Sequence, residues 1–200
     1  MPASASLLIT RQGEVEELNL FKRLIYSCSK TKIGVYMQIR NITLKDTDEF
    51  ITFQLRLDEE TEYMMYEPGE RNPQRDRTEA LIRGAMDGDN FLMVIEDKDK
   101  LWGYISAERG GLNRIRHTAY IVTGICTSYR NQGIGTKFFN ELDKWAEQNK
   151  ISRLELTVMC HNETAVGLYE KKGFRKEGIK KNSMLVNGSY VDEYYMAKLL

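Results

Sequence analysis

Apolar and polar residues alternate with two periods along this chain, one typical of helices and one typical of strands. In the first half, apolar residues recur at helical spacing twice, and shorter strand-like runs lie before and after them. Pro68-Gly69 and Pro73 predict a loop between the two helices. The expected order is a strand from Met37, helices over residues 43–60 and 78–86, and strands over residues 91–95, 101–107 and 119–126.

The second half has a sharper pattern. A stripe of Ile134, Phe138, Leu142 and Trp145 predicts a long helix up to about residue 149. The remaining predicted elements are a half-buried strand over residues 153–158, a helix over residues 163–172, and a hairpin of two strands that turns at Asn187-Gly188.

Three local residue patterns predict where helices begin and end. Asn162 is expected to cap the helix that follows it, and Gly173 is expected to adopt the left-handed conformation just after that helix. For the helix over residues 78–86, Thr78 or Asp76 is the expected cap.

The first 36 residues differ from the rest, and we expect the folded domain to span residues 37–200. Residues 1–36 are predicted to be a weakly ordered N-terminal extension. A short helix is the alternative, since apolar residues there could share one helical face. These apolar residues are Leu18, Leu20, Phe21, Leu24 and Ile25.

Charge and composition exclude several classes of protein. Lys plus Arg and Asp plus Glu each number 29 in the 200 residues, and this balance argues against a general nucleic-acid binder. No run of 18 apolar residues exists, so no membrane span is expected. Three scattered cysteines and no recognisable secretory signal fit a reducing, cytoplasmic setting.

Gly133 and Gly135 open the long helix and leave backbone N–H groups uncovered at its N-terminus. Such a terminus binds anions, and Arg130 adds a positive charge beside it. A plain tight turn is the alternative, because two glycines alone are a weak signal. The sequence lacks the first glycine of an ATP-binding P-loop and the third glycine of a dinucleotide fingerprint.

Two motifs, about 30 residues apart, together resemble the GNAT superfamily of N-acetyltransferases. The first is its Arg/Gln-x-x-Gly-x-Gly/Ala pyrophosphate loop, here residues 130–135. The second is Asn-x-x-Ala-x-x-Leu-Tyr-x-x-x-Gly-Phe, here residues 162–174. The closing hairpin at residues 188–196 resembles the bacterial branch near RimJ/RimL-like and small-molecule amine acetyltransferases.

The resemblance implies an α/β fold: a mixed, mostly antiparallel, splayed central sheet flanked by helices. Acetyl-CoA would lie in the splay between the strands at 119–126 and 153–158, and no metal is expected. The pyrophosphate would sit on the glycine loop, and Lys171 or Lys172 could meet the 3′-phosphate. The residues expected to bind the cofactor are Ile125, Thr127, Arg130, Asn131, Gln132, Gly133, Ile134, Gly135, Thr136, Asn162 and Lys171.

The family reaction is direct attack of an amine on the thioester. The resemblance makes Tyr169 the acid that protonates the leaving thiolate; a purely packing tyrosine is the alternative. A backbone N–H near Ile125 is the candidate oxyanion donor. Many relatives carry a Glu on the strand before the loop, and this chain does not, which leaves His117 or a water chain as the base. Cys126 and Cys160 have no evident base partner and are not expected to be nucleophiles.

The acceptor is expected to be a small-molecule amine or a protein N-terminus. Residues 46–70 hold nine acidic residues and one basic residue, which would favour a cationic acceptor if they wall its site; a solvated acidic helix face is the alternative. The last strand, from residue 190, could pair across a homodimer or close the sheet.

The sequence therefore predicts an acetyl-CoA-dependent N-acetyltransferase. A non-catalytic acyl-CoA-binding regulatory protein is the main alternative, because the strand acid is missing. A nucleotide-binding scaffold that holds ATP on the glycine loop is disfavoured by the absent Lys-Ser/Thr pair.

Overall fold

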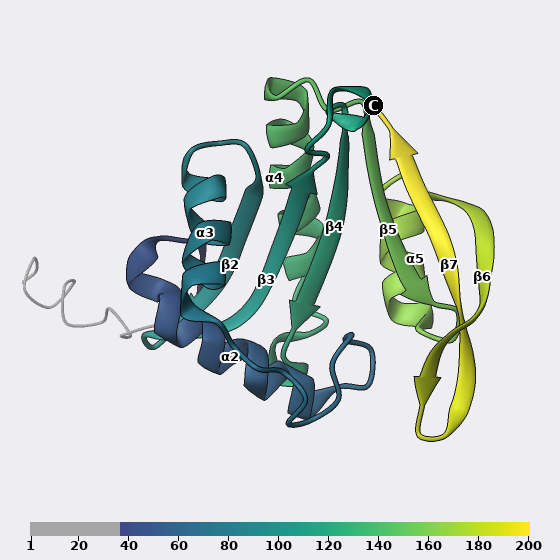
Figure 1. Ribbon diagram of the computed structural model, residues 1–200, viewed down its shortest axis with the longest axis horizontal. Helices are drawn as coiled ribbons and strands as arrows, with labels where there is room; N and C mark the ends of the chain where they lie inside the picture. Colours follow the sequence, from purple (N-terminus) through teal and green to yellow (C-terminus); the bar gives the residue numbers. More distant parts are fainter. Residues whose placement is uncertain (1–36) are drawn as a thin grey trace, which may run out of the picture. The chain divides into compact units, whose positions relative to one another are not determined.

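The computed structural model describes residues 37–200, which form one seven-stranded sheet with helices on both faces (Figure 1). The expected extension at residues 1–36 lies outside the described residues. The strands are β1 (Gln38–Asn41), β2 (Phe91–Asp97), β3 (Lys100–Arg109), β4 (Thr118–Ile125), β5 (Arg153–Met159), β6 (Arg175–Val186) and β7 (Ser189–Leu199). The helices are α2 (Thr47–Glu60), α3 (Arg75–Met86), α4 (Ile134–Gln148) and α5 (Glu163–Lys171).

The strand order is β1-β2-β3-β4-β5-β7-β6, and every neighbouring pair is antiparallel except β4 and β5. The parallel pair is joined only at the start of β4, where Thr118 to Tyr120 pair with Arg153 to Glu155. Beyond Tyr120 the two strands diverge, as Figure 1 shows. The expected α/β fold with a mixed, mostly antiparallel, splayed sheet is confirmed.

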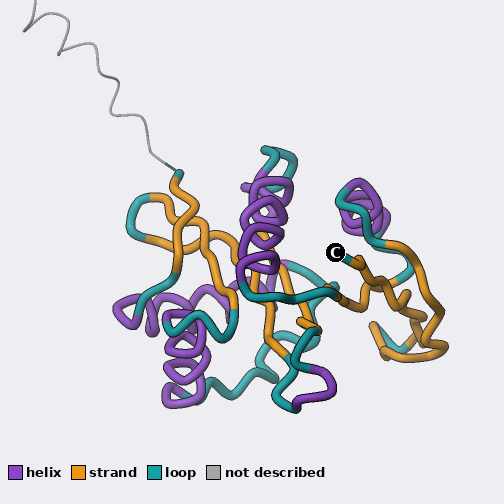
Figure 2. Tube along the Cα trace, turned by 90° about the horizontal axis from the view of Figure 1, so that it is seen from above, coloured by secondary structure: helices purple, strands orange, loops and turns teal. Residues whose placement is uncertain are grey.

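The helices form two layers. Helices α2 and α3 cover one face of β1–β4, and α4 and α5 lie on the opposite face (Figures 1 and 2). On the α2 side, Phe50 and Phe53 pack edge-on against Tyr104 of β3. No helix within residues 37–200 is long and apolar enough to cross a membrane.

The core beneath α4 and α5 draws on both sides of the splay. It includes Ile121 of β4, Leu156 of β5 and Met196 of β7, all packed with Phe138 of α4. The helices behind the sheet therefore hold its two halves together while β4 and β5 separate.

Two of the three local predictions are confirmed, and the third is wrong. The Asn162 side chain accepts a hydrogen bond from the Ala165 amide at 3.2 Å and so caps α5. Gly173 follows α5 with a φ of +90°. Helix α3, however, begins at Arg75, with Gln74 as its N-cap and no side-chain cap. Thr78 lies one turn inside, where its hydroxyl donates to the Gln74 carbonyl oxygen at 3.2 Å.

The last strand closes the sheet. Strand β7 pairs with β5 on one side and with β6 on the other, so both of its edges are used within the chain. Asn187 and Gly188 both have positive φ, as the predicted tight hairpin turn between β6 and β7 requires. Over Glu193–Leu199, β7 therefore closes the sheet between β5 and β6.

A buried ion pair fixes the loop between α2 and α3. The Asp58 side chain at the end of α2 is 2% exposed and accepts two hydrogen bonds from Arg71. The Arg71 guanidinium also stacks on Tyr66 of the same loop, 4.2 Å from the ring centroid. Because both charges are taken from water, each depends on the other for its stability.

We expect Asp58→Asn to lower the free energy of unfolding by about 3 kcal/mol, because Arg71 then keeps a buried charge without its partner. Asp48→Asn is the matched control, since the Asp48–Arg75 pair also joins α2 to α3 but its side chains are 80% and 53% exposed. The control should change the stability by less than about 0.5 kcal/mol. Urea unfolding of both variants measures the difference, and equal losses would contradict a special role for the buried pair.

Candidate active site

The divergence of β4 from β5 leaves one edge of β4 without a partner strand. The Cys126 amide donates to the Trp102 carbonyl oxygen of β3 at 2.9 Å. Since backbone groups alternate in direction along an antiparallel strand, those of Thr123 and Ile125 point away from β3, toward the open edge. An extended ligand could pair with them as an added strand would.

Two backbone groups at the end of this edge already have side-chain hydrogen-bond partners. The Arg130 Nε donates to the Ile125 carbonyl oxygen at 2.8 Å, and Glu60 of α2 accepts the Thr127 amide at 2.9 Å. Arg130 is thus fixed at the strand end with the rest of its guanidinium available for an anion. The contact from Glu60 was not predicted, because nothing in the sequence relates α2 to this loop.

The loop into α4 begins the helix with a left-handed glycine. Gly133 is the N-cap residue of the 15-residue helix α4, with a φ of +74°, and Asn131 also has a positive φ. The side-chain amide of Gln132 donates to the Ser128 carbonyl oxygen at 3.1 Å and so bridges the turn. A Cβ at Gly133 would meet no atom within 4 Å, so there is open space beside Gly133 at the start of α4, where uncovered N–H groups favour an anion.

The second glycine has a packing role. A Cβ at Gly135 would come to 2.6 Å from the Leu168 side chain of α5. Gly135 therefore allows α4 and α5 to pack closely, and it lies inside α4 with ordinary helical backbone. The two glycines of the motif thus differ: Gly133 begins α4 in the left-handed conformation, and Gly135 lets α5 pack against it.

This close packing sets the position of Tyr169 on α5. Its ring packs against Phe139 and Phe174, with centroids 5.6 and 6.1 Å away, and the residue is 7% exposed. Its hydroxyl has no hydrogen-bond partner among residues 37–200. Burial raises the pKa of Tyr169 above its ordinary value, and the nearby Tyr120 phenol adds to the shift. The ring has the packing role, and the free, protonated hydroxyl remains available as an acid.

A side-chain bridge marks the point where the sheet divides. The Tyr120 hydroxyl of β4 lies 2.9 Å from the Thr157 hydroxyl of β5. Thr157 comes two residues after Glu155, the last residue of β5 that pairs with β4. Nothing in the sequence indicated this bridge, because it depends on the register of the diverging strands.

The remaining predicted cofactor residues lie around this centre. Ile134 is buried in the core at the start of α4, while Thr136, two residues later, is exposed. The Asn162 side chain is used in capping α5. Lys171 ends α5 as an exposed cation, and its neighbour Lys172 donates to Asn140 of α4 at 2.7 Å. All of these residues belong to α4, α5 or the turns that begin them.

Two candidate groups are not where catalysis would need them. His117 lies just before β4, and its carbonyl oxygen accepts the Ser152 amide at 2.9 Å, at the end where β4 and β5 are still paired. It is therefore remote from the open edge. Cys126 is buried, and burial raises the pKa of its thiol, with Glu60 adding to the shift. Within the described residues, no group of three or more His, Cys, Asp or Glu side chains could hold a metal ion.

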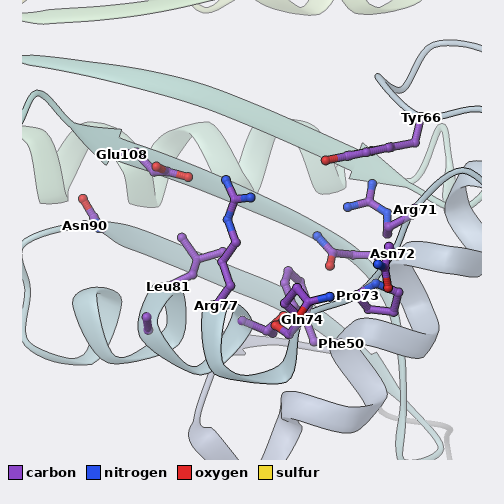
Figure 3. A pocket seen from close by; sticks show the side chains of 13 residues that line it. Phe50, Tyr66, Arg71, Asn72, Pro73, Gln74, Arg77, Leu81, Asn90 and Glu108 are labelled. Atoms are coloured by element: carbon purple, nitrogen blue, oxygen red, sulfur yellow. Dashed lines mark hydrogen bonds between the residues drawn. The ribbon is translucent and has the colours of Figure 1, made fainter.

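On the other face of the sheet, a cleft of about 470 Å³ lies between α2, α3 and β3 (Figure 3). Its lining is mostly polar, and its charged members are Arg71, Arg77 and Glu108. This size suits a small molecule. The cleft was not predicted, because its walls come from segments separated by up to 58 residues.

The acidic segment at residues 46–70 is partly neutralised in the folded chain. Three of its nine carboxylates pair with arginines from outside the segment: Asp46 with Arg40, Asp48 with Arg75, and Asp58 with Arg71. Arg56, the one basic residue of the segment, pairs with Glu49. The other five acidic residues make no ion pair with a lysine or arginine among residues 37–200, so the segment keeps an acidic excess.

Comparison with known proteins agrees with this geometry. Residues 52–174 match the model of the acetyltransferase (GNAT) family. The match covers more than half of the chain, from α2 through the glycine loop to the end of the second motif. The chain therefore belongs to the GNAT family of N-acetyltransferases, an enzyme family that uses acetyl-CoA.

Curated relatives and solved structures extend the comparison. The L-amino acid N-acetyltransferase AaaT of Escherichia coli is 30% identical over 136 residues, covering 55% of this chain and 82% of the relative. The GNAT-family acetyltransferase from Streptococcus pneumoniae superposes with a TM-score of 0.77 at 26% identity, covering 82% of this chain and 99% of that one. The phosphinothricin acetyltransferase from Sinorhizobium meliloti, solved with acetyl-CoA, gives 0.71 at 16% identity, covering 82% and 88%.

We expect Gly133→Ala to weaken acetyl-CoA binding by about tenfold, because the new methyl group occupies the space in front of the α4 amides. Gly188→Ala is the matched control. It has a similar φ of +76° and equally open surroundings, but it lies in the β6–β7 turn. Both variants should lose about 1–2 kcal/mol of stability from the left-handed backbone. Calorimetric titration with acetyl-CoA separates them, and equal affinities would place the pyrophosphate elsewhere.

Proposed function

We propose that this enzyme transfers an acetyl group from acetyl-CoA to a primary amine by direct attack within a ternary complex. The observation that carries the proposal is the open edge of β4. It ends at a helix N-terminus suited to an anion and has a largely buried tyrosine, Tyr169, nearby. The pantetheine arm would pair with the backbone of Thr123 and Ile125, and its pyrophosphate would lie on residues 130–136.

The chemistry follows from this placement. The amine nitrogen attacks the thioester carbon, and the carbonyl oxygen becomes an oxyanion. The N–H of Ile125, which points to the open edge, is the proposed donor to that oxygen. When the C–S bond breaks, the sulfur keeps the electron pair and takes a proton from the Tyr169 hydroxyl. Burial favours this transfer, because a desolvated thiolate also binds a proton more tightly.

The attacking amine must lose a proton, and no acidic side chain stands on the open edge of β4. Residues 121–125 are Ile, Val, Thr, Gly and Ile. We infer that water accepts this proton or that the amine enters in its neutral form. The rate should then follow the ionisation of the acceptor, with a pKa near 10.4 for an alkylamine and near 8 for an α-amine of a peptide.

The acceptor class is a small-molecule amine or a protein N-terminus. The names of two relatives support both: AaaT from Escherichia coli acts on L-amino acids, and a ribosomal-protein-alanine N-acetyltransferase from Brucella melitensis has the same fold, with a TM-score of 0.71. The acidic residues of 46–70 that make no ion pair with a lysine or arginine keep a cationic acceptor within this class.

The proposal is tested by following thiol release from acetyl-CoA with a panel of amino acids, polyamines, aminoglycosides and peptides with free N-termini. Turnover with one class supports the proposal and identifies the acceptor. Acetyl-CoA binding with no turnover on any class would favour the alternative, a non-catalytic acyl-CoA-binding regulatory protein.

We expect Tyr169→Phe to lower kcat by about 10²- to 10⁴-fold, the usual contribution of a general acid, while stability changes little because the hydroxyl has no partner to lose. Tyr194→Phe is the matched control: this tyrosine also packs on the core behind the sheet but lies on β7. The raised pKa keeps Tyr169 protonated to at least pH 10, so the wild-type rate should climb with pH up to that point without a falling limb. A full rate in Tyr169→Phe would make its role one of packing only.

A further inference from the structure

The loop after α2 crosses the opening between β4 and β5. On the β4 side, a Cβ placed at Gly124 would come to 3.5 Å from the sulfur of Met64 in this loop. On the other side, the neighbouring Tyr63 packs against His161, with ring centroids 5.5 Å apart. Figure 1 shows the loop at the wide end of the opening. Since consecutive Cα atoms are about 3.8 Å apart, two adjacent residues of one loop contact both sides of the opening.

His161 lies just after β5, level with the end of the open edge of β4. The two strands are parallel, and their last paired residues are Tyr120 and Glu155. Continued in that register, His161 is opposite Cys126, the residue after Ile125. An extended arm that pairs with β4 would lie about 4.8 Å from it, as an added strand does. The arm would therefore pass between Ile125 and the end of β5, with His161 on its far side.

A carboxylate faces the ring of His161. Oε1 of Glu62 lies 4.0 Å from Nε2 of His161, and Oε2 of Glu62 accepts a hydrogen bond from the Asn187 side chain at 3.2 Å. Asn187 lies in the β6–β7 turn, so the hairpin holds this carboxylate in place. The His161 side chain is 46% exposed and forms no hydrogen bond with another residue in 37–200. Its second nitrogen, Nδ1, is therefore uncommitted.

We propose that His161 accepts the proton of the attacking amine, directly or through one water, and that Glu62 is the residue that positions its ring. In the neutral ring, the Nε2 proton faces Glu62. The Nδ1 lone pair takes the proton that the amine nitrogen releases as this nitrogen bonds to the thioester carbon. The resulting imidazolium lies beside the Glu62 carboxylate, whose negative charge favours the transfer. Solvent then removes the proton from the exposed ring.

This inference rests on the proposed acetyl transfer and deepens it by naming the group that receives the proton. Histidine is the side chain that most often acts as a general base near neutral pH. The chain has two histidines, and His117 lies at the opposite, paired end of β4. Glu60 also lies near the end of β4, but its carboxylate accepts the Thr127 amide. His161 is therefore the histidine that faces the open edge, from the side opposite to β4.

The test measures kcat with acetyl-CoA, the full chain and the panel amine that turns over fastest. His161→Ala should lower kcat by about 10²-fold or more, the usual contribution of a general base, and leave the Kd for acetyl-CoA unchanged. Added imidazole should restore part of this rate, because the lost ring leaves space for it, and should not raise the wild-type rate. His161→Phe keeps an aromatic ring against Tyr63 but has no nitrogen. It should lose the same rate and not respond to imidazole.

Glu62→Gln tests the positioning role of the carboxylate. On its own it should lower kcat by about tenfold, and in the His161→Ala background it should have no further effect, because Glu62 acts through that ring. Equal losses in both backgrounds would contradict this role.

His117→Gln is the matched control, because it removes the other histidine of the chain. It should leave kcat and the Kd for acetyl-CoA unchanged. Three results would each overturn the role of His161 and leave the acetyltransferase proposal intact: a wild-type rate in His161→Ala, a loss that imidazole does not restore, or a full rate in His161→Phe. Binding of acetyl-CoA by the wild-type enzyme without turnover of any amine would instead overturn the proposed function.

Discussion

The separation of β4 from β5 is the constraint on which the rest of the structure depends. Parallel pairing ends at Tyr120, and from there β4 presents a row of unpaired backbone groups. Such an edge is costly unless something satisfies it, and Arg130 and Glu60 satisfy only its end. The free part is a template for an extended ligand, and the glycine loop that follows supplies an anion site in line with it. In the proposed function, this one topological feature positions both ends of the cofactor.

The two halves of the sheet stay together by contacts away from that edge. Behind the sheet, α4 and α5 form one core with residues of β4, β5 and β7, and Gly135 allows these helices to approach closely. In front, the loop after α2 reaches across: Glu62 accepts from Asn187 at 3.2 Å, and Tyr63 lies 5.5 Å from the His161 ring. The opening is therefore framed by fixed elements, which is what holds Tyr169 at a defined place beside it.

The two faces of the sheet differ in burial and in charge. Behind the sheet, an apolar setting keeps the Tyr169 phenol protonated and without a partner. In front, three carboxylates of the acidic segment pair with arginines outside it, and these pairs hold α2 to the strand β1, to α3 and to the loop between α2 and α3.

The sequence by itself determined the order and type of nearly every element from residue 37 onward. Helical and strand periods are local, and so are the Asn162 cap, the Asn187-Gly188 turn and the two motifs that indicated the family. The sequence did not predict contacts between distant segments. The Tyr120–Thr157 bridge depends on the register of strands that pair over only three residues, and the Glu60 contact depends on where α2 ends. The start of α3 was missed because no side chain caps it. The cleft depends on packing α2 and α3 against β3, and only the tertiary structure shows which charges find partners and which do not.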